Sequence, residues 1–329
     1  MKKIKVIEMG GTISAQGTDR LDRQDYTSGI YEGNDFLKDL PELKNQSEVD
    51  FFKFSQVSST EINQIHWIKL RALIVYFLNK QNYDGVVITH GTSTLEETAY
   101  FLHLTIPTNK PVVLVGAQRP YSSLSSDAHL NLIQAIKVAS SDYSYNKGVL
   151  IALNNEINSA REASKSHTYQ VQAFTSSEAG LLGMIEPDDS IQYYREPLRL
   201  HTVNSEFSNL NITNLPEVAI IYSYAGAKGD LINSIIDTKN YQGIVIAGTG
   251  AGLMSPDEKA ALLKAQKSGM FIVRSSRVGS GRVTETKNFI NSNFIAGDNL
   301  SPQKARILLM VALLKYHNVS DIQEVFDSY

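Results

Sequence analysis

Hydroxyl side chains directly follow two of the apolar, strand-like runs of this sequence. Residues 4–9 lead into Gly10-Gly11-Thr12-Ile13-Ser14, where two glycines permit a sharp turn that leaves backbone N–H groups and the Thr12 hydroxyl facing a cleft. Residues 86–89 lead into His90-Gly91-Thr92-Ser93-Thr94. A threonine hydroxyl is a weak nucleophile at neutral pH and needs a neighbouring base. A tight turn between a strand and a helix is the alternative explanation for the glycine pair.

Lys165 is the candidate for that base. It lies in Ser159-Ala160-Arg161-Glu162-Ala163-Ser164-Lys165-Ser166. A single lysine is most often a solvated surface group. A buried amine with a lowered pKa can, however, accept the proton of a hydroxyl group.

Two further segments have both a structural and a functional interpretation. Residues 15–30 are polar and contain Gly17, Tyr26 and Gly29, which is typical of a mobile lid. Thr94 with Glu97 three residues later forms a capping-box pattern, so structure alone explains these two residues. The structural explanation fits Thr92 less easily, because the Thr92 side chain would point from the loop into the cleft.

A third glycine cluster, Gly248-Thr249-Gly250-Ala251-Gly252, superficially suggests a dinucleotide-binding loop. It lacks the last glycine of the G-x-G-x-x-G pattern, and no acidic residue closes a second strand about 20 positions later. A nucleotide-binding α/β protein therefore remains only as an alternative.

The elements that would position these groups alternate between strands and helices. Strand-like runs are mostly continuous, as expected when both faces of a sheet are covered; they span residues 4–9, 86–89, 112–115, 149–153, 218–222, 244–247 and 271–274. Helical spacing occurs in residues 62–79, 94–102, 128–140, 256–267 and 302–315. This alternation predicts a two-domain α/β protein: a larger N-terminal, mostly parallel sheet flanked by helices, and a smaller C-terminal parallel α/β domain.

The domain boundaries follow from composition. Residues 193–216 are polar and lack a regular period. We therefore predict an N-terminal catalytic domain of residues 1–193, a linker of residues 194–213 and a C-terminal domain of residues 214–329.

Composition excludes several classes of protein. The 31 basic and 34 acidic residues nearly balance, and no basic stripe or known module predicts a nucleic-acid partner. There are no cysteines, which rules out thiolate chemistry and disulfides.

No stretch has the roughly 20 apolar residues of a membrane span, and no signal-peptide pattern follows Met1. We expect a cytoplasmic protein with no membrane partner, or an exported one if Met1 replaces a removed signal.

Taken together, these motifs resemble the bacterial L-asparaginases, in order and over essentially the whole chain. The resemblance is closest to the glutaminase-asparaginase, or type II, branch, whose members are commonly exported. It is carried by Gly10-Gly11-Thr12-Ile13, Tyr26, Ile88-Thr89-His90-Gly91-Thr92, Leu95-Glu96-Glu97-Thr98-Ala99-Tyr100-Phe101-Leu102, Gly116-Ala117-Gln118-Arg119-Pro120, Lys165, Arg274-Ser275-Ser276-Arg277 and Pro302-Gln303-Lys304-Ala305-Arg306.

The resemblance implies an amidohydrolase that acts on a small-molecule amide and needs no cofactor or metal. Thr12 would be the nucleophile that forms an acyl-enzyme, with Tyr26 adjusting its hydroxyl. Thr92 and Lys165 would move protons and activate water. Backbone donors near Thr92 and Ala117 would hold the developing oxyanion, and Ser59 would contact the substrate carboxylate. Gly11, Gly91 and Ala117 are further residues that the resemblance implies in substrate binding.

The substrate-head residues depart from the family pattern. The family motif reads His-Gly-Thr-Asp-Thr, and its Asp holds the α-ammonium of the substrate; here the position is Ser93. Thr60 replaces a longer polar residue, and Ala251 replaces an Asn that the neighbouring subunit contributes. Glu285 is the possible match for a second residue from that subunit. Because an ammonium that loses its carboxylate partner binds several kcal/mol less tightly, we expect a preference for substrates whose α-amine is absent, acylated or uncharged. An engineered Ser93 would explain only one of the three departures.

Two other expectations follow from the resemblance. The protein would be a homotetramer, a dimer of dimers, in which the partner's C-terminal domain completes each active site. The alternative function is a catalytically weakened, asparaginase-like protein that binds a small amide, or one that supplies ammonia within an assembly. Assembly subunits usually carry an additional N-terminal domain, for which this chain has no room.

Overall fold

Two units make up the chain in the computed structural model, which describes residues 1–43 and 47–329. The first comprises residues 1–210 and the second residues 211–329. All of residues 194–217 are described, and they contain the single 3-10 helix η4 (Thr202–Asn204). Within residues 1–43 and 47–329, no helix is long and apolar enough to cross a membrane.

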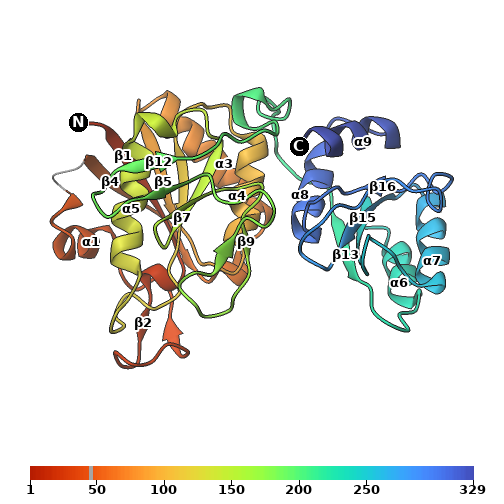
Figure 1. Cartoon of the computed structure of the whole chain (residues 1–329), viewed down its shortest axis with the longest axis horizontal. Helices are drawn as coiled ribbons and strands as arrows, with labels where there is room; N and C mark the ends of the chain where they lie inside the picture. The colour runs from red at the N-terminus through yellow and green to blue at the C-terminus, as the bar shows by residue number, and fades with distance from the viewer. Residues whose placement is uncertain (44–46) are drawn as a thin grey trace. The chain divides into compact units, whose positions relative to one another are not determined.

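An eight-stranded mixed sheet forms the centre of the N-terminal unit (Figure 1). Its order is β12-β11-β8-β7-β6-β5-β1-β4. The strands from β4 to β7 are parallel, whereas β8, β11 and β12 are added antiparallel. Their bounds are β1 (Lys3–Gly10), β4 (Glu48–Val57), β5 (Gly85–Thr89), β6 (Val112–Val115), β7 (Val149–Leu153), β8 (Glu156–Ser159), β11 (Gly183–Ile185) and β12 (Ile191–Tyr193).

Helices cover both faces of this sheet, which explains why its central strands are continuously apolar. Helices α1 (Gly33–Asp39) and α5 (Ala128–Ser140) cover one face, and α3 (Gln64–Asn79) and α4 (Leu95–Thr105) cover the other (Figure 1). The core under α5 includes Ile4, Val6 and Leu132, all fully buried. The predicted α/β layering of this domain is confirmed.

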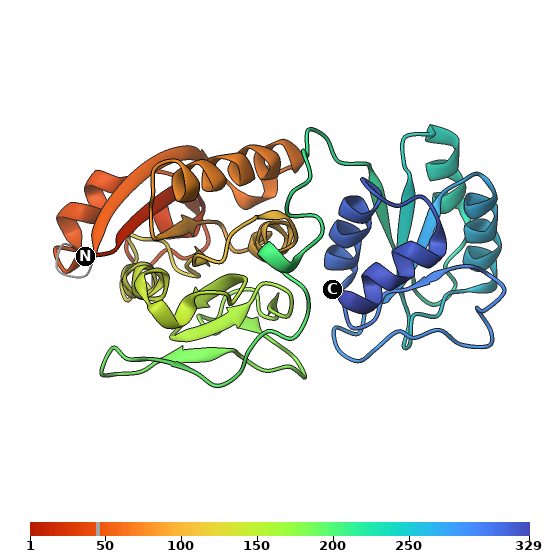
Figure 2. The ribbon, with the colours of Figure 1, turned by 90° about the horizontal axis from the view of Figure 1, so that it is seen from above.

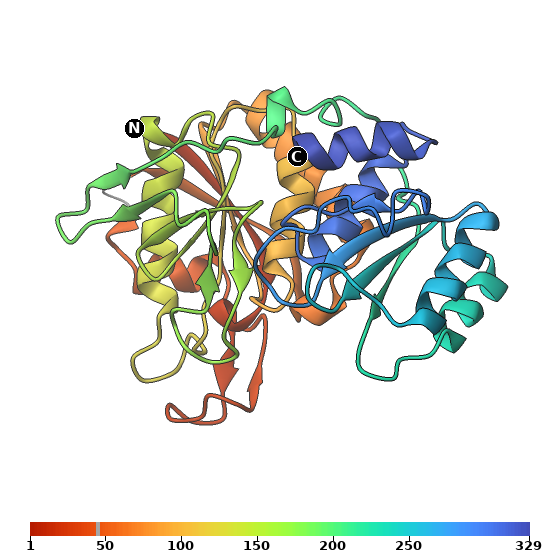
Figure 3. The same cartoon turned by 45° about the vertical axis from the view of Figure 1, so that its right-hand side comes forward.

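Two short hairpins and three 3-10 helices occur near the ends of these strands. Hairpin β2 (Gln16–Gly17) with β3 (Tyr26–Thr27) follows η1 (Thr12–Ser14), and hairpin β9 (Ser164–Lys165) with β10 (Phe174–Thr175) follows β8. Besides η1 and η4, the described part of the unit contains the 3-10 helices η2 (Ser59–Glu61), after β4, and η3 (Asp142–Ser144). Both hairpins lie at the end of the sheet where β1 ends (Figure 3). The residues predicted as a lid thus form the β2–β3 hairpin and its flanks.

Four parallel strands form the sheet of the C-terminal unit, in the order β13-β14-β15-β16. Figure 2 shows α6 and α7 on one side of this sheet and α8 and α9 on the other. The bounds are β13 (Val218–Tyr222), α6 (Asp230–Thr238), β14 (Gly243–Gly248), α7 (Pro256–Lys267), β15 (Phe271–Ser276), β16 (Ile295–Ala296), α8 (Pro302–Ala312) and α9 (Val319–Ser328). The predicted parallel α/β fold of this domain is confirmed.

Candidate active site

Thr12 lies at the first turn after β1, where the chain changes direction. Gly10 and Gly11 have φ angles of 90° and 86°, a region that residues with a Cβ rarely adopt. This turn brings Thr12 to a buried position, with 8% of its surface exposed. The Thr12 Oγ1 atom lies 2.9 Å from the Tyr26 hydroxyl oxygen, so the β2–β3 hairpin supplies the hydrogen-bond partner of this side chain.

The loops after β1, β5 and β4 are packed against each other by glycines. A Cβ atom built on Gly11 would lie 2.3 Å from the backbone nitrogen of Gly91. A Cβ atom on Gly91 would in turn lie 2.8 Å from the Oγ atom of Ser59. Only glycine permits both approaches, and they bring Thr12, Thr92 and Ser59 into one neighbourhood.

Thr92 and Lys165 form the second pair of polar side chains. The Lys165 amine donates a hydrogen bond of 2.7 Å to Thr92 Oγ1. Glu96, 4% exposed at the start of α4, accepts the backbone N–H of Lys165 at 2.7 Å. Burial lowers the pKa of Lys165 below its ordinary value of 10.5, and the negative charge of Glu96 partly opposes this shift. The lowered pKa makes the neutral amine, which can accept a proton, more accessible.

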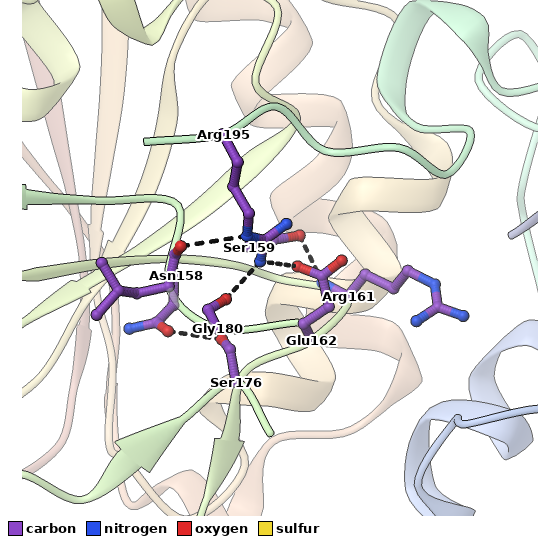
Figure 4. Close-up of polar contacts among 8 residues, drawn as sticks. Asn158, Ser159, Arg161, Glu162, Ser176, Gly180 and Arg195 are labelled. Atoms are coloured by element: carbon purple, nitrogen blue, oxygen red, sulfur yellow. Dashed lines mark hydrogen bonds and ion pairs between the residues drawn. The ribbon is translucent and has the colours of Figure 1, made fainter. Parts of the chain in front are cut away.

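An ion pair anchors the segment that carries Lys165. Arg195 pairs with Glu162 at 2.9 Å and donates to the carbonyl groups of Gly180 and Leu181 (Figure 4). Because Glu162 stands three residues before Lys165, these contacts join the β9 segment to the chain near β11. They limit the positions that the lysine can take.

Two backbone N–H groups close to this second pair have no partner in the described part of the chain. Within the described residues, the N–H groups of Thr92 and Ala117 donate to no backbone or side-chain acceptor. The loop after Ala117 is held by Asp127, whose carboxylate accepts the N–H groups of Gln118 and Arg119 at 2.9 to 3.2 Å. Free donors at the ends of neighbouring parallel strands are suited to stabilising an oxyanion.

The expected contact residues for the substrate head lie on η2 and on the loop before α4. Ser59 is 5% exposed, whereas Thr60 and Ser93 are exposed. The Thr60 hydroxyl lies 2.9 Å from that of Ser58, and Ser93 has no hydrogen-bond partner among the described residues.

The predicted capping box at Thr94 is wrong. Thr94 is the N-cap residue of α4, but its side chain makes no capping hydrogen bond. Its hydroxyl instead donates to the Ser59 carbonyl oxygen at 2.8 Å. The contact between the η2 segment and the loop after β5 has therefore replaced the local cap.

Ala251 and Glu285 belong to the C-terminal unit. Ala251 is exposed in a turn that is closed by the N–H of Leu253 donating to the Thr249 carbonyl oxygen at 2.8 Å. Glu285 is also exposed, and its charge acts on buried Arg274. The glycine-rich turn does not open a helix directly, because α7 begins only at Pro256. This differs from the strand–loop–helix arrangement that a dinucleotide-binding loop requires.

A cavity of about 490 Å³ lies between the tip of the β2–β3 hairpin, the loop after Ala117 and the β9–β10 hairpin. Such a volume is suited to a small molecule. The lining includes Arg23, Gln118, Arg119 and Gln170, but not Thr12, Thr92 or Lys165, so the cavity borders the hairpin tips rather than these side chains.

Sequence reasoning missed Glu96, Asp127 and Arg195 as supports of the site. Glu96 was part of a recognised motif, but an acidic residue in a first helical turn is usually explained by the helix dipole. Glu96 stands four residues before buried Tyr100, which places it on the apolar face of α4. This position was the sequence signal that Glu96 is a buried residue.

The site combines a hydroxyl at a strand end, a second hydroxyl bonded to a half-buried lysine, and free N–H donors. These are the groups that a hydrolase acting through an acyl intermediate requires. Comparison with known proteins agrees with this class. Residues 3–199 match the family described as "Asparaginase, N-terminal", and residues 217–326 match the "Glutaminase/Asparaginase C-terminal domain". The chain belongs to the asparaginase family.

Relatives of known name are similar over the full length of the chain. L-asparaginase 2 of Escherichia coli is 38% identical, covering 100% of this chain and 94% of the relative, and L-asparaginase 2 of Bacillus subtilis is 37% identical, covering 100% and 87%. The crystal structure of a probable cytoplasmic L-asparaginase from Campylobacter jejuni has a TM-score of 0.96 at 36% identity, covering 100% of both chains. The predicted resemblance is confirmed.

Proposed function

We propose that this protein hydrolyses the side-chain carboxamide of an asparagine-like substrate to a carboxylate and ammonia. The observation that carries the proposal is that the Thr12–Tyr26 and Thr92–Lys165 pairs stand on loops in direct contact through Gly11 and Gly91. The Escherichia coli, Bacillus subtilis and Campylobacter jejuni relatives are named as L-asparaginases, which supports the same amide.

The reaction has two stages. Thr12 Oγ1 attacks the carboxamide carbon, its proton passes through the neighbouring hydroxyl and amine groups to the amide nitrogen, and this nitrogen leaves as ammonia when the C–N bond breaks. Water then attacks the resulting ester; Lys165, through Thr92, accepts one proton of this water and returns it to Thr12 Oγ1 as the ester bond breaks, and the other proton leaves with the carboxyl product. In both stages the N–H groups of Thr92 and Ala117 stabilise the negative oxygen, an effect worth about 3 kcal/mol per donor.

The residues expected at the substrate head favour a substrate without a charged α-amine. Ser93 and Thr60 carry no charge, and the carboxylate of neighbouring Glu61 is already bound to the Ser58 N–H at 3.1 Å. An α-ammonium would thus lose water on binding without gaining a carboxylate partner from these residues of its own subunit. Substrates with an acylated or missing amine avoid this cost.

An ammonia-release assay tests both parts of the proposal. We expect activity on N-acetyl-L-asparagine or on succinamate, the des-amino analogue, to exceed that on free L-asparagine, and Thr12→Ala to abolish all of it. Ordinary efficiency on free asparagine would refute the selectivity. Absence of release from every amide, with binding retained in calorimetry, would instead favour the weakened amide-binding protein.

We propose further that the active enzyme is a homotetramer whose partner subunits contribute the Ala251 and Glu285 regions to each site. The support is the family resemblance. Sedimentation velocity should show a tetramer, and activity per subunit should fall when dilution produces monomers. Full activity of an isolated monomer would contradict shared sites.

We propose a cytoplasmic location. A structural relative is named a probable cytoplasmic L-asparaginase, whereas a Haemophilus influenzae relative, 39% identical, is named a probable periplasmic one. Cell fractionation with activity found only in the periplasm would overturn this assignment.

A further inference from the structure

A chain of three buried hydrogen bonds leads from α3 to the loop that carries Thr92. Trp67 Nε1 lies 2.9 Å from Thr98 Oγ1, and the same oxygen lies 2.9 Å from His90 Nε2. The other ring nitrogen, His90 Nδ1, lies 2.7 Å from the Gly91 carbonyl oxygen. Trp67 is 4% exposed, and Thr98 and His90 are 0% exposed, so water does not compete for these bonds.

The two ends of this chain fix the direction of every bond in it. An indole N–H can only donate, so the Thr98 oxygen accepts from Trp67. A backbone carbonyl can only accept, so His90 Nδ1 carries a proton and donates it to Gly91. Burial lowers the pKa of His90 to about 4, which leaves the ring neutral with a single proton at physiological pH. His90 Nε2 therefore accepts the Thr98 hydroxyl proton, and one tautomer satisfies all four groups.

The last bond determines where the next N–H points. In a planar trans peptide, the carbonyl of Gly91 and the N–H of Thr92 point in opposite directions. Since the carbonyl is held by the imidazole, the Thr92 N–H faces away from His90, and it is one of the two free donors described above. Residue 91 has no side chain that could restrain this peptide, so the bond from the imidazole adds a restraint that the glycine itself cannot provide.

We propose that Trp67, Thr98 and His90 are positioning residues for hydrolysis, which hold the Gly91–Thr92 peptide so that the Thr92 N–H is presented to the oxyanion. This inference rests on the proposed amide hydrolysis. It assigns a role to an imidazole that touches neither nucleophile nor substrate.

Two substitutions of His90 separate this role from packing. Asparagine places a donor where Nδ1 stands, and glutamine places one where Nε2 stands. We expect His90→Asn to keep kcat within about tenfold of the native enzyme. His90→Gln should lose about 100- to 1000-fold in kcat with little change in KM, the loss typical of one oxyanion donor. Equal losses in the two variants, at matched thermal stability, would overturn the proposal.

A second pair of variants tests the other end of the chain and serves if the His90 variants do not fold. Thr98→Ser keeps the hydroxyl and should retain most of kcat, whereas Thr98→Val should lower it. Thr105→Val is the matched control on the same helix, because Thr105 is fully buried and its hydroxyl donates only to the Phe101 carbonyl oxygen at 2.7 Å. A kcat loss in Thr105→Val as large as in Thr98→Val would contradict the assignment.

The tautomer itself can be observed without any activity. Nitrogen-15 NMR of the native protein, with His90 assigned by its disappearance in His90→Asn or its shift in Thr98→Val, should show Nδ1 protonated and Nε2 unprotonated near pH 7. The reverse tautomer would refute the chain. A correct tautomer in a protein that releases no ammonia would locate the failure in the proposed function instead.

Discussion

Gly11 and Gly91 approach so closely that a Cβ atom on the first would lie 2.3 Å from the backbone nitrogen of the second. This contact joins the turn that carries the proposed nucleophile to the loop that carries Thr92. The relative position of the two threonines therefore depends on two residues that have no side chains.

Gly11→Ala should destabilise the protein by several kcal/mol and abolish activity, because the clash with the Gly91 backbone adds to an unfavourable φ of 86°. The control is Gly226→Ala, at a φ of 79° with open space around its Cβ position, where only about 1 kcal/mol of backbone strain is expected. Thermal denaturation and ammonia release measure both. Similar effects of the two substitutions would show that strain, rather than the contact, governs this turn.

Tyr26→Phe should lower kcat about a hundredfold with little change in KM, since it removes the hydroxyl 2.9 Å from Thr12 Oγ1. Tyr26 is 37% exposed, so the melting temperature should stay nearly constant. Tyr143→Phe, which removes a hydroxyl from a side chain on η3 that is 74% exposed, is the control. Unchanged kcat in Tyr26→Phe would exclude the tyrosine from proton transfer.

Glu96→Gln should move the rising limb of the pH profile of kcat/KM to lower pH. The carboxylate raises the pKa of Lys165 against the effect of burial, so its neutralisation lowers that pKa further. A base must be unprotonated to act, and the active fraction therefore grows at a lower pH. Glu97→Gln is the neighbouring control. If the rising limb shifts to higher pH, or does not shift, Lys165 is not the base.

Glu8→Gln should stabilise the protein at alkaline pH and leave it unchanged at acidic pH. Glu8 is 4% exposed, with Oε1 lacking a partner. Burial, and then the negative charge of Glu32, raise its pKa to about 7, while Gly33 N–H and Lys53 oppose the shift. The protonated form favours folding below pH 4.5, and this stability is lost as the pH rises through 7. The gain above pH 8 should be about 3 kcal/mol.

Unfolding in urea at pH 4 and pH 8.5 measures this difference. Glu32→Gln should give a smaller effect of the same sign, because its charge is the second cause of the shift. Equal stability of Glu8→Gln and the native protein at both pH values would show that Glu8 ionises at its ordinary pKa.

Ser93→Asp should lower KM for free L-asparagine by about 10- to 100-fold, the effect of one hydrogen bond to a charged group. The des-amino analogue should gain nothing, and Ser93→Asn provides a neutral side chain of nearly the same size. If KM for both substrates falls equally, residue 93 does not recognise the α-amine.

The sequence predicted the central strands and several helices well because their signals are local. Strands β5, β6 and β7 are buried on both faces and read as continuous apolar runs. Helices α5 and α7 have the predicted bounds. Strand β4 was missed, because it lies at an edge of the sheet and half-exposed polar residues interrupt its apolar pattern.

The sequence could predict only those residues of the site that directly follow a strand. Thr12 and Thr92 stand where a parallel sheet collects its loops. The Thr94 hydroxyl was assigned to a cap, yet it binds the Ser59 carbonyl, which only the folded sheet brings near. Whether the departures at Ser93, Thr60 and Ala251 alter the substrate stays a prediction.

The β2–β3 hairpin is bonded to the loop after Pro120. Gly17 N–H donates to Ser122 Oγ at 2.9 Å, and Leu124 N–H donates to the Arg20 carbonyl at 2.8 Å. Any swing of the hairpin breaks these bonds and withdraws Tyr26 from Thr12 in the same movement. Thr12 therefore loses its Tyr26 partner whenever the hairpin is displaced. Water that then reaches Thr12 finds its hydroxyl group without the tyrosine that would assist proton transfer.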